Sequence, residues 1–208
     1  MKSLRFTLPV VSLFASTLLA SPINLNSPVT LNGSFPAYTS PVGPGLCGTT
    51  PPQASASTLD DGVFLPENTC YQSGTVYWNS QNPLNTIDID LQGTFLINGA
   101  IVQADDNDIY ELQYRDIGGV YHNWYDVPTL GSFGMVTRPG SPDQTLIHAL
   151  PAVQATGLRF FAPVGSGDGE WSVSEIQVFA AVPEPSTTWL VLGGLGLLFA
   201  GVIKRRHV

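Results

Sequence analysis

The chain has 208 residues, of which 43% are hydrophobic, and a formal net charge of −8 at neutral pH. The region between Ser21 and Val182 is more acidic, because it holds only three arginines against 15 acidic residues, a formal charge of −12. Such a surface repels nucleic acids, whose phosphates require basic patches, so no nucleic-acid partner is expected. The length allows one domain with a sizeable core, since two of the apolar stretches lie at the ends of the chain.

The first 20 residues have the layout of a secretory signal peptide. Lys2 and Arg5 precede an apolar run from Leu8 to Leu19, and the small residues Ala20 and Ser21 follow it. We therefore predict export and cleavage after Ala20. The alternative is an uncleaved membrane anchor, but the apolar run is short for a membrane span.

Residues 36–57 are rich in Pro, Gly, Ser and Thr and predict a long insertion loop. The two cysteines of the chain, Cys47 and Cys70, would meet an oxidising compartment after export, where disulfides persist. We predict a bridge between them, which would close a loop of about 24 residues and stabilise the fold by about 3 kcal/mol. The alternative is two unpaired thiols in loops.

The central region has an all-β pattern, because short segments rich in β-branched and aromatic residues alternate with clusters of Gly, Pro, Asn and Asp. Residues 86–91 alternate regularly, which directs Ile87, Ile89 and Leu91 to one face of a half-buried strand. The other predicted strands are Val29–Leu31, Phe95–Val102 with an interruption near Asn98-Gly99, Ile109–Tyr114, Leu158–Ala162 and Trp171–Phe179. We expect these strands to close into a β-sandwich.

The C-terminal segment has three parts. Residues 182–187 read Val-Pro-Glu-Pro-Ser-Thr, residues 187–203 are nearly all apolar, and residues 204–208 are basic. As a helix, 187–203 would be about 25 Å long, slightly short of a hydrocarbon core of about 30 Å, so it predicts a transmembrane helix with some local thinning of the bilayer. The basic tail should stay in the cytoplasm, which places the preceding domain on the other side of the membrane.

This tail resembles the PEP-CTERM sorting signal of Gram-negative bacteria, which a membrane protease, the exosortase, reads. The resemblance implies that Pro183, Glu184 and Pro185 are the recognition residues, and two prolines suit this role because they keep the segment extended. It also implies a protein that is membrane-anchored before processing and then reaches the cell surface or extracellular matrix. The alternative is an ordinary C-terminal anchor with a Pro-rich linker.

The order of several short stretches in the central region shows a second resemblance. The stretches concerned are Ile23–Leu25, Val29–Thr30, Leu59–Val63, Ile87–Leu91, Asp108–Tyr114, Gly157–Phe160, Gly167–Gly169 and Ser174–Val178. Together they resemble the discoidin-like branch of the galactose-binding-like jelly rolls, which implies a jelly-roll β-sandwich over residues 21–181. One departure is that the end-to-end disulfide of that family has no counterpart, because Cys47 and Cys70 lie close together in the first third of the chain.

The second resemblance implies a structural Ca²⁺ site, because carbohydrate-binding modules of this fold often hold the ion between an Asp-Gly loop and a glutamate of the last strand. The matching residues are Asp60 or Asp61 together with Glu175. Clustered carboxylate and carbonyl oxygens are the ligands that Ca²⁺ prefers. A second acidic cluster at residues 105–108 falls in a predicted hairpin turn, where the turn preference of Asp and Asn competes with metal binding.

Candidate ligand-binding residues are Tyr121, His122 and Trp124, because sugar sites combine aromatic rings with adjacent polar groups. A second patch of this composition is Tyr77-Trp78-Asn79. The resemblance offers another role for Trp124, since the family places a buried structural tryptophan near this position.

Catalysis lacks a recognisable motif in this sequence: there is no Gly-x-Ser-x-Gly elbow, no His-Glu-x-x-His helix and no Gly-rich phosphate loop. The leading hypothesis is therefore an exported, non-catalytic surface or matrix protein that binds a glycan or exopolysaccharide. The first alternative is a purely structural surface component with no specific ligand. The second is a polysaccharide-processing enzyme, because carboxylates are frequent enough to form an acid–base pair.

Overall fold

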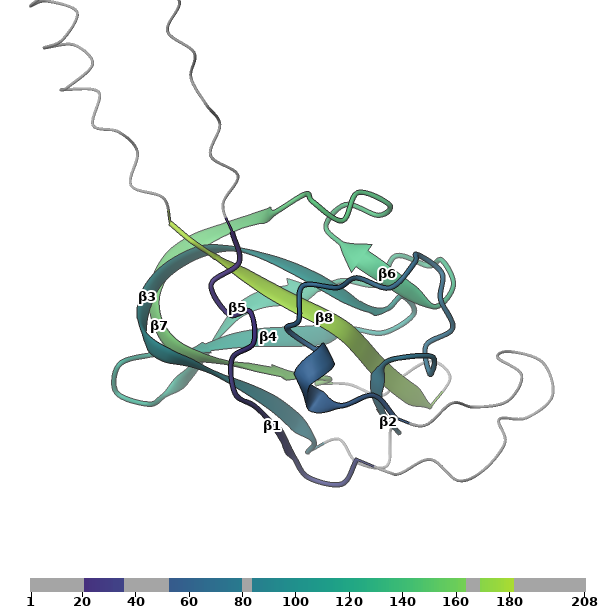
Figure 1. The fold of residues 1–208 in the computed structure, drawn as a ribbon, viewed down its shortest axis with the longest axis horizontal. Helices are drawn as coiled ribbons and strands as arrows, with labels where there is room; N and C mark the ends of the chain where they lie inside the picture. Colours follow the sequence, from purple (N-terminus) through teal and green to yellow (C-terminus); the bar gives the residue numbers. More distant parts are fainter. Residues whose placement is uncertain (1–20, 36–52, 80–83, 164–168, 182–208) are drawn as a thin grey trace, which may run out of the picture.

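The computed structural model describes residues 21–35, 53–79, 84–163 and 169–181, and these residues form strands and one short 3-10 turn (Figure 1). The elements are β1 (Val29–Asn32), η1 (Ala56–Thr58), β2 (Val76–Asn79), β3 (Thr86–Asp105), β4 (Tyr110–Arg115), β5 (Tyr121–Val127), β6 (Met135–Arg138), β7 (His148–Phe161) and β8 (Glu170–Ala180). The predicted all-β fold is confirmed. None of the helical structure within these four ranges could cross a membrane, and the predicted signal peptide, sorting motif and transmembrane helix lie outside them.

Strand β3 is the central element of the fold, because it pairs with four other strands. The sheet order is β2-β8-β3-β7-β4-β5, and β1 and β6 also pair with β3. The first part of β3 pairs with β1 and its last part pairs with β8 and β6, whereas β7 pairs with β3 from Ile87 to Ala100. A register shift between Asp90 and Phe95 separates the part that pairs with β1 from the part that pairs with β8. The strand therefore bends and belongs to both layers of the sandwich, as its curved course beside β7 shows (Figure 1).

The structure differs from the predicted strands in several places. β2, β5 and β6 were not predicted, and β7 begins at His148 rather than at residue 158. Residues 86–91 and 95–102 are parts of one strand rather than two, because β7 pairs with both of them on either side of residues 92–94. The acidic turn at residues 105–108 is not a hairpin turn. It joins β3 to β4, and these two strands do not pair with each other. The last part of β3 pairs with β8 and β6, whereas β4 pairs with β5 and β7.

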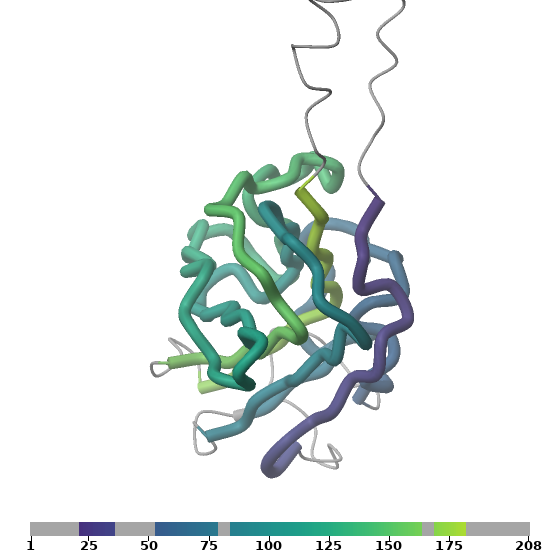
Figure 2. Tube along the Cα trace, turned by 90° about the vertical axis from the view of Figure 1, so that its left-hand side faces the viewer, coloured from purple at the N-terminus to yellow at the C-terminus, as the bar shows by residue number. Residues whose placement is uncertain are grey.

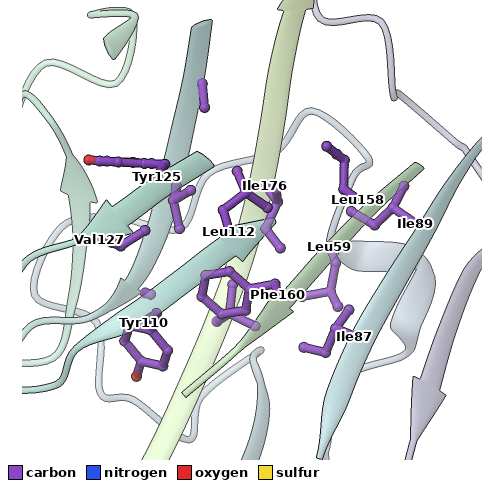
Figure 3. Close-up of a cluster of buried hydrophobic side chains, with 14 of the residues drawn as sticks. Leu59, Ile87, Ile89, Tyr110, Leu112, Tyr125, Val127, Leu158, Phe160 and Ile176 are labelled. Atoms are coloured by element: carbon purple, nitrogen blue, oxygen red, sulfur yellow. The ribbon is translucent and has the colours of Figure 1, made fainter. Parts of the chain in front are cut away.

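The core lies between the two layers and is rich in aromatic rings. Ile87, Ile89 and Leu91 are buried, as their alternation predicts. The Trp78 and Trp171 rings pack with their centroids 6.0 Å apart within the core cluster. Figure 3 shows other side chains of the same core, including the Tyr110 and Phe160 rings. Burial of each large apolar side chain contributes about 1.5–3 kcal/mol, so this cluster is the main source of stability. Trp78, part of the second predicted ligand patch, is a core residue.

The two ends of the described domain lie side by side. Pro22 forms a β-bridge with Phe179, and the Ile23 amide donates to the Val178 carbonyl at 2.9 Å. The Asn24 side chain extends this contact, because its amide donates to the Ile176 carbonyl and its oxygen accepts from the Val178 amide. The first and last described segments therefore end on the same side of the domain (Figures 1 and 2).

The stretch before β2 is held against the start of β6. Thr69 forms a β-bridge with Met135, and the Asn68 amide donates to the Met135 carbonyl at 2.9 Å. Gly134 permits this approach, since it has a φ of +68° and a Cβ there would lie 2.3 Å from the Thr69 carbonyl oxygen. The next residue, Cys70, is disulfide-bonded, and its predicted partner Cys47 lies outside the described residues.

We predict that Gly134→Ala is far more destabilising than Gly131→Ala. Both glycines have a positive φ, which costs about 1 kcal/mol for alanine, but a Cβ at 131 meets nothing within 4 Å. The clash at 134 should add about 1–3 kcal/mol. Urea unfolding of the two variants measures the difference, and equal losses of unfolding free energy would show that the contact with Thr69 can relax.

Candidate functional site

The three predicted ligand-binding residues lie on β5, but they do not share one surface. Trp124 is buried, and its Nε1 donates to the Pro151 carbonyl at 2.9 Å. A bulge opposite Leu112 and Gln113 lets β5 accommodate this residue in the core-facing row. The Trp124 ring thus packs in the core, which is the alternative role that the sequence raised for it.

His122 lies at the start of β5 and contacts the turn that joins β4 to β5. Its Nε2 lies 2.7 Å from Asp116 Oδ2, and its ring stacks on Tyr114 with a centroid distance of 5.1 Å. The hydrogen bond from His122 lowers the pKa of Asp116, and the Val120 amide acts in the same direction. These contacts close the turn, and they occupy both one ring face and the Nε2 atom of His122.

Tyr121 faces the opposite side, on the outer surface of the sheet. The Arg159 guanidinium lies over its ring, with Cζ 3.8 Å from the centroid. Arg159 also donates through Nε and Nη2 to the two carboxylate oxygens of Asp88, each at 2.7 Å. Asp88 accepts a further bond from Asn32 Nδ2 at 3.0 Å. Burial and the negative charge of Asp88 raise the pKa of the Tyr121 hydroxyl, which therefore stays protonated.

A second ion pair lies beside the first. Arg115 Nη2 donates to Asp90 Oδ1 at 2.9 Å, and Nε donates to Thr156 Oγ1 at 3.0 Å. The guanidinium lies close to Gly157, where a Cβ would come within 2.9 Å of Arg115 Cζ. The two ion pairs and Tyr121 come from β3, β4, β5 and β7, so no local sequence signal identifies them.

The predicted metal ligands Asp60 and Glu175 are both fully buried. Asp60 Oδ2 accepts from the Ser27 amide at 2.7 Å, and Glu175 Oε1 accepts from the Gly62 amide at 3.1 Å and from Gln177 Nε2 at 3.0 Å. The second oxygen of each carboxylate, Asp60 Oδ1 and Glu175 Oε2, has no hydrogen-bond partner. A buried polar atom without a partner is costly, so these two oxygens require an explanation.

The electrostatics of this carboxylate pair are unfavourable without a cation. Burial raises the pKa of Asp60 to about 6 and that of Glu175 to about 8, and the nearby charges of Asp61 and Asp60 also raise the pKa of Glu175. Asp61 itself is exposed, and its Oδ1 accepts from the Val63 amide at 2.8 Å. Two carboxyl groups with raised pKa values, each with one oxygen that lacks a hydrogen-bond partner, fit a hard cation such as Ca²⁺.

The donor set at Asp60 and Glu175 would need backbone oxygens to complete it. Within the described ranges no group of three or more His, Cys, Asp and Glu side chains is arranged to hold a metal. Ca²⁺ takes six to eight oxygen ligands and readily uses carbonyl groups. The loop at residues 59–62 and the N-terminal segment meet beside these carboxylates, since the Asn26 amide donates to the Asp60 carbonyl.

The acidic cluster at residues 105–108 has another cationic neighbour, the buried Arg138. Asp105, Asp106 and Asp108 are each about 2% exposed. The Arg138 guanidinium donates to the carbonyl groups of Ala104, Val136 and Asp105. Burial lowers the pKa of Arg138, and the nearby charges of Asp106 and Asp105 act in the opposite direction. A buried guanidinium here supplies the positive charge that a metal ion would otherwise supply. No local sequence pattern around Arg138 indicates that it is buried.

Glu67 is the other carboxylate with several partners. Thr137, Ser141 and Gln144 donate to it, and although burial alone would raise its pKa, these bonds lower it. Glu67 is therefore ionised at neutral pH and holds the residues after β6 in place. A general acid for glycoside hydrolysis needs the opposite shift.

The described residues have the fold of a galactose-binding-like, discoidin-like β-sandwich, which the following solved structures share. A fucose-binding module from Streptococcus pneumoniae superposes with a TM-score of 0.50 at 13% identity, over 78% of this chain and 99% of that chain. The lectin domain of lectinolysin, solved with the Lewis B antigen, gives a TM-score of 0.52 at 10% identity, over 78% and 98%. Chitosan-binding module 1 of a Paenibacillus chitosanase/glucanase gives 0.47 at 18% identity, over 77% and 99%.

The tail has a separate match. Residues 181–206 match the family described as the PEP-CTERM protein-sorting motif, so the predicted sorting signal is confirmed. No curated protein sequence matches the chain. The motif implies export, with membrane anchoring before processing, and recognition by an exosortase.

Proposed function

We propose that this chain is an exported, non-catalytic glycan-binding protein of the cell surface or extracellular matrix of a Gram-negative bacterium. One combination carries the proposal: a sorting motif at residues 181–206 follows directly on a β-sandwich of the carbohydrate-binding-module class. Two solved structures of this fold are described as a fucose-binding module and as a lectin domain in complex with Lewis B antigen. We propose a glycan or exopolysaccharide as the ligand of this chain on the basis of that likeness in fold.

The domain offers the chemistry that glycan binding needs. Sugar sites combine fixed polar groups with aromatic rings, and a non-catalytic site needs no proton donor with a raised pKa in contact with solvent. Tyr121 and the two arginine–aspartate pairs beside it meet the first requirement. The strongly raised carboxylate pKa values belong to Asp60 and Glu175, which are fully buried.

We predict that the purified full-length protein binds a subset of glycans on an array that carries neutral, amino-sugar and acidic oligosaccharides. Heat-denatured protein is the control for non-specific adsorption. Release of reducing ends from the same oligosaccharides would instead support a polysaccharide-processing enzyme. Retention of none of the glycans would favour a structural surface component.

The sorting motif generates a second prediction. The residues after Pro185 should be removed in a host that has an exosortase, because Pro183 and Pro185 keep the recognised segment extended at the membrane surface. Mass spectrometry of the exported protein should find a C-terminus near residues 183–186. Glu184→Gln tests recognition of the carboxylate. Mature wild-type protein that keeps Lys204-Arg205-Arg206 would contradict the prediction.

We propose that Asp60 and Glu175 hold a structural Ca²⁺, with Asp61 adding negative charge beside them. The ion would supply the positive charge that the two unsatisfied carboxylate oxygens lack. It would also join three parts of the chain: the N-terminal segment through Ser27, the loop through Gly62, and β8.

Chelation should therefore lower the melting temperature of the full-length protein. Binding to the folded state alone adds about 2.7 kcal/mol at a hundredfold excess of Ca²⁺ over Kd. Glu175→Gln should remove the response to Ca²⁺ and should not destabilise the protein in EDTA, because it removes a buried charge. Glu111→Gln, at a half-buried glutamate of β4, is the matched control and should keep the response. Identical wild-type melting curves with EDTA and with Ca²⁺ would contradict the site.

A further inference from the structure

We propose that the outer face of the layer β1-β3-β7-β4-β5 is the glycan-binding platform, and that it takes a neutral glycan chain. The outer face is defined by Asp88, Asp90, Gln113, Arg115, Tyr121, Asn123, Gly157 and Arg159. The inference rests on the proposed glycan binding and adds to it the surface and the class of ligand.

Strand register places these side chains in two parallel rows. Asp88 pairs with Arg159, Arg159 with Gln113, and Gln113 with Asn123. Residues that pair directly across antiparallel strands point to the same face. The alternating neighbours Ile89 and Leu158 are buried in the core, so this row points away from the core. Strands lie about 4.8 Å apart, so the row of four spans about 14 Å, enough for a short oligosaccharide.

The second row is Asp90, Gly157, Arg115 and Tyr121. Glycine weakens the interior of a strand and often marks a close approach to the backbone. Here Gly157 leaves room for the Arg115 guanidinium, because a Cβ at 157 would lie 2.9 Å from Arg115 Cζ, and Arg115 Nη2 reaches Asp90. The guanidinium therefore lies close to the backbone at the centre of the layer.

The face offers donors and acceptors that are already held in place. A sugar hydroxyl both donates and accepts, and adjacent hydroxyls suit a carboxylate beside a guanidinium. Arg159 uses two N–H groups on Asp88 and has five in all, so further donors remain for a ligand. Because the ion pairs fix these groups before binding, little side-chain entropy is lost when a ligand binds. Gln113 and Asn123 extend the row with amides that donate and accept.

Charge selects a neutral ligand. The region between Ser21 and Val182 has three arginines, and Arg138 is buried, so Arg115 and Arg159 are its two cations at the surface. Each is neutralised by an aspartate on the same face. No positive potential therefore remains to attract uronate or sulfate groups, while the formal charge of −12 repels them.

The test is affinity electrophoresis of the full-length protein in gels that contain a polysaccharide. The neutral probes are glucan, galactan, mannan and a fucose-containing polymer, and the anionic probes are alginate and polygalacturonate. Wild type should be retarded by at least one neutral polymer and by neither anionic one. Arg159→Ala and Gln113→Ala should each weaken that binding at least about tenfold. Gln154→Ala is the matched control, because Gln154 is exposed on β7 but pairs with Leu96 beyond the register shift.

Each outcome has one meaning. If Arg159→Ala lowers the melting temperature, Gln113→Ala still tests the face, because it breaks no ion pair. Wild-type affinity in Gln113→Ala and Arg159→Ala would overturn the platform and leave glycan binding intact. Retardation by the anionic polymers would overturn the neutral ligand class. Retardation by no polymer, combined with a negative glycan array, would overturn the proposed function and the platform with it.

Discussion

The rest of the structure depends on one bent strand. β3 pairs with β1 before its bend, with β8 and β6 after it, and with β7 on both sides, so the relative position of the two layers follows from β3 and the strand that accompanies it. The core forms where the layers face each other, and the outer face lies on the other side of the first layer. Gln92, with a φ of +57°, lies at the bend.

The strands could be predicted where their side chains alternate. Ile87, Ile89 and Leu91 identified one buried face, and β8 was found almost to its ends. The continuity of β3 could not be predicted, because Gln92 and Gly93 interrupt the alternation and only the pairing with β7 on both sides of them makes one strand. β5 appeared as a ligand patch rather than a strand, since the bulge beside Trp124 interrupts its alternation.

The candidate site was only partly visible in the sequence. The resemblance identified Asp60, Asp61 and Glu175, but two adjacent aspartates look alike in the sequence, and only the structure shows that Asp60 is buried and Asp61 exposed. The outer face was not visible at all, because its residues meet through the register of strands far apart in the chain. Arg138 illustrates the same limit: burial makes it a structural cation, whereas Arg115 and Arg159 stay at the surface.

The adjacent chain ends have a mechanical consequence for an anchored protein. The tail continues from β8, which pairs with the last part of β3, while the outer face includes the first part of that strand. A glycan that pulls on the outer face and a membrane that holds the tail would therefore load opposite layers. Because β3 belongs to both layers, the force would run along one covalent backbone, and the packing between the layers would not have to resist it alone.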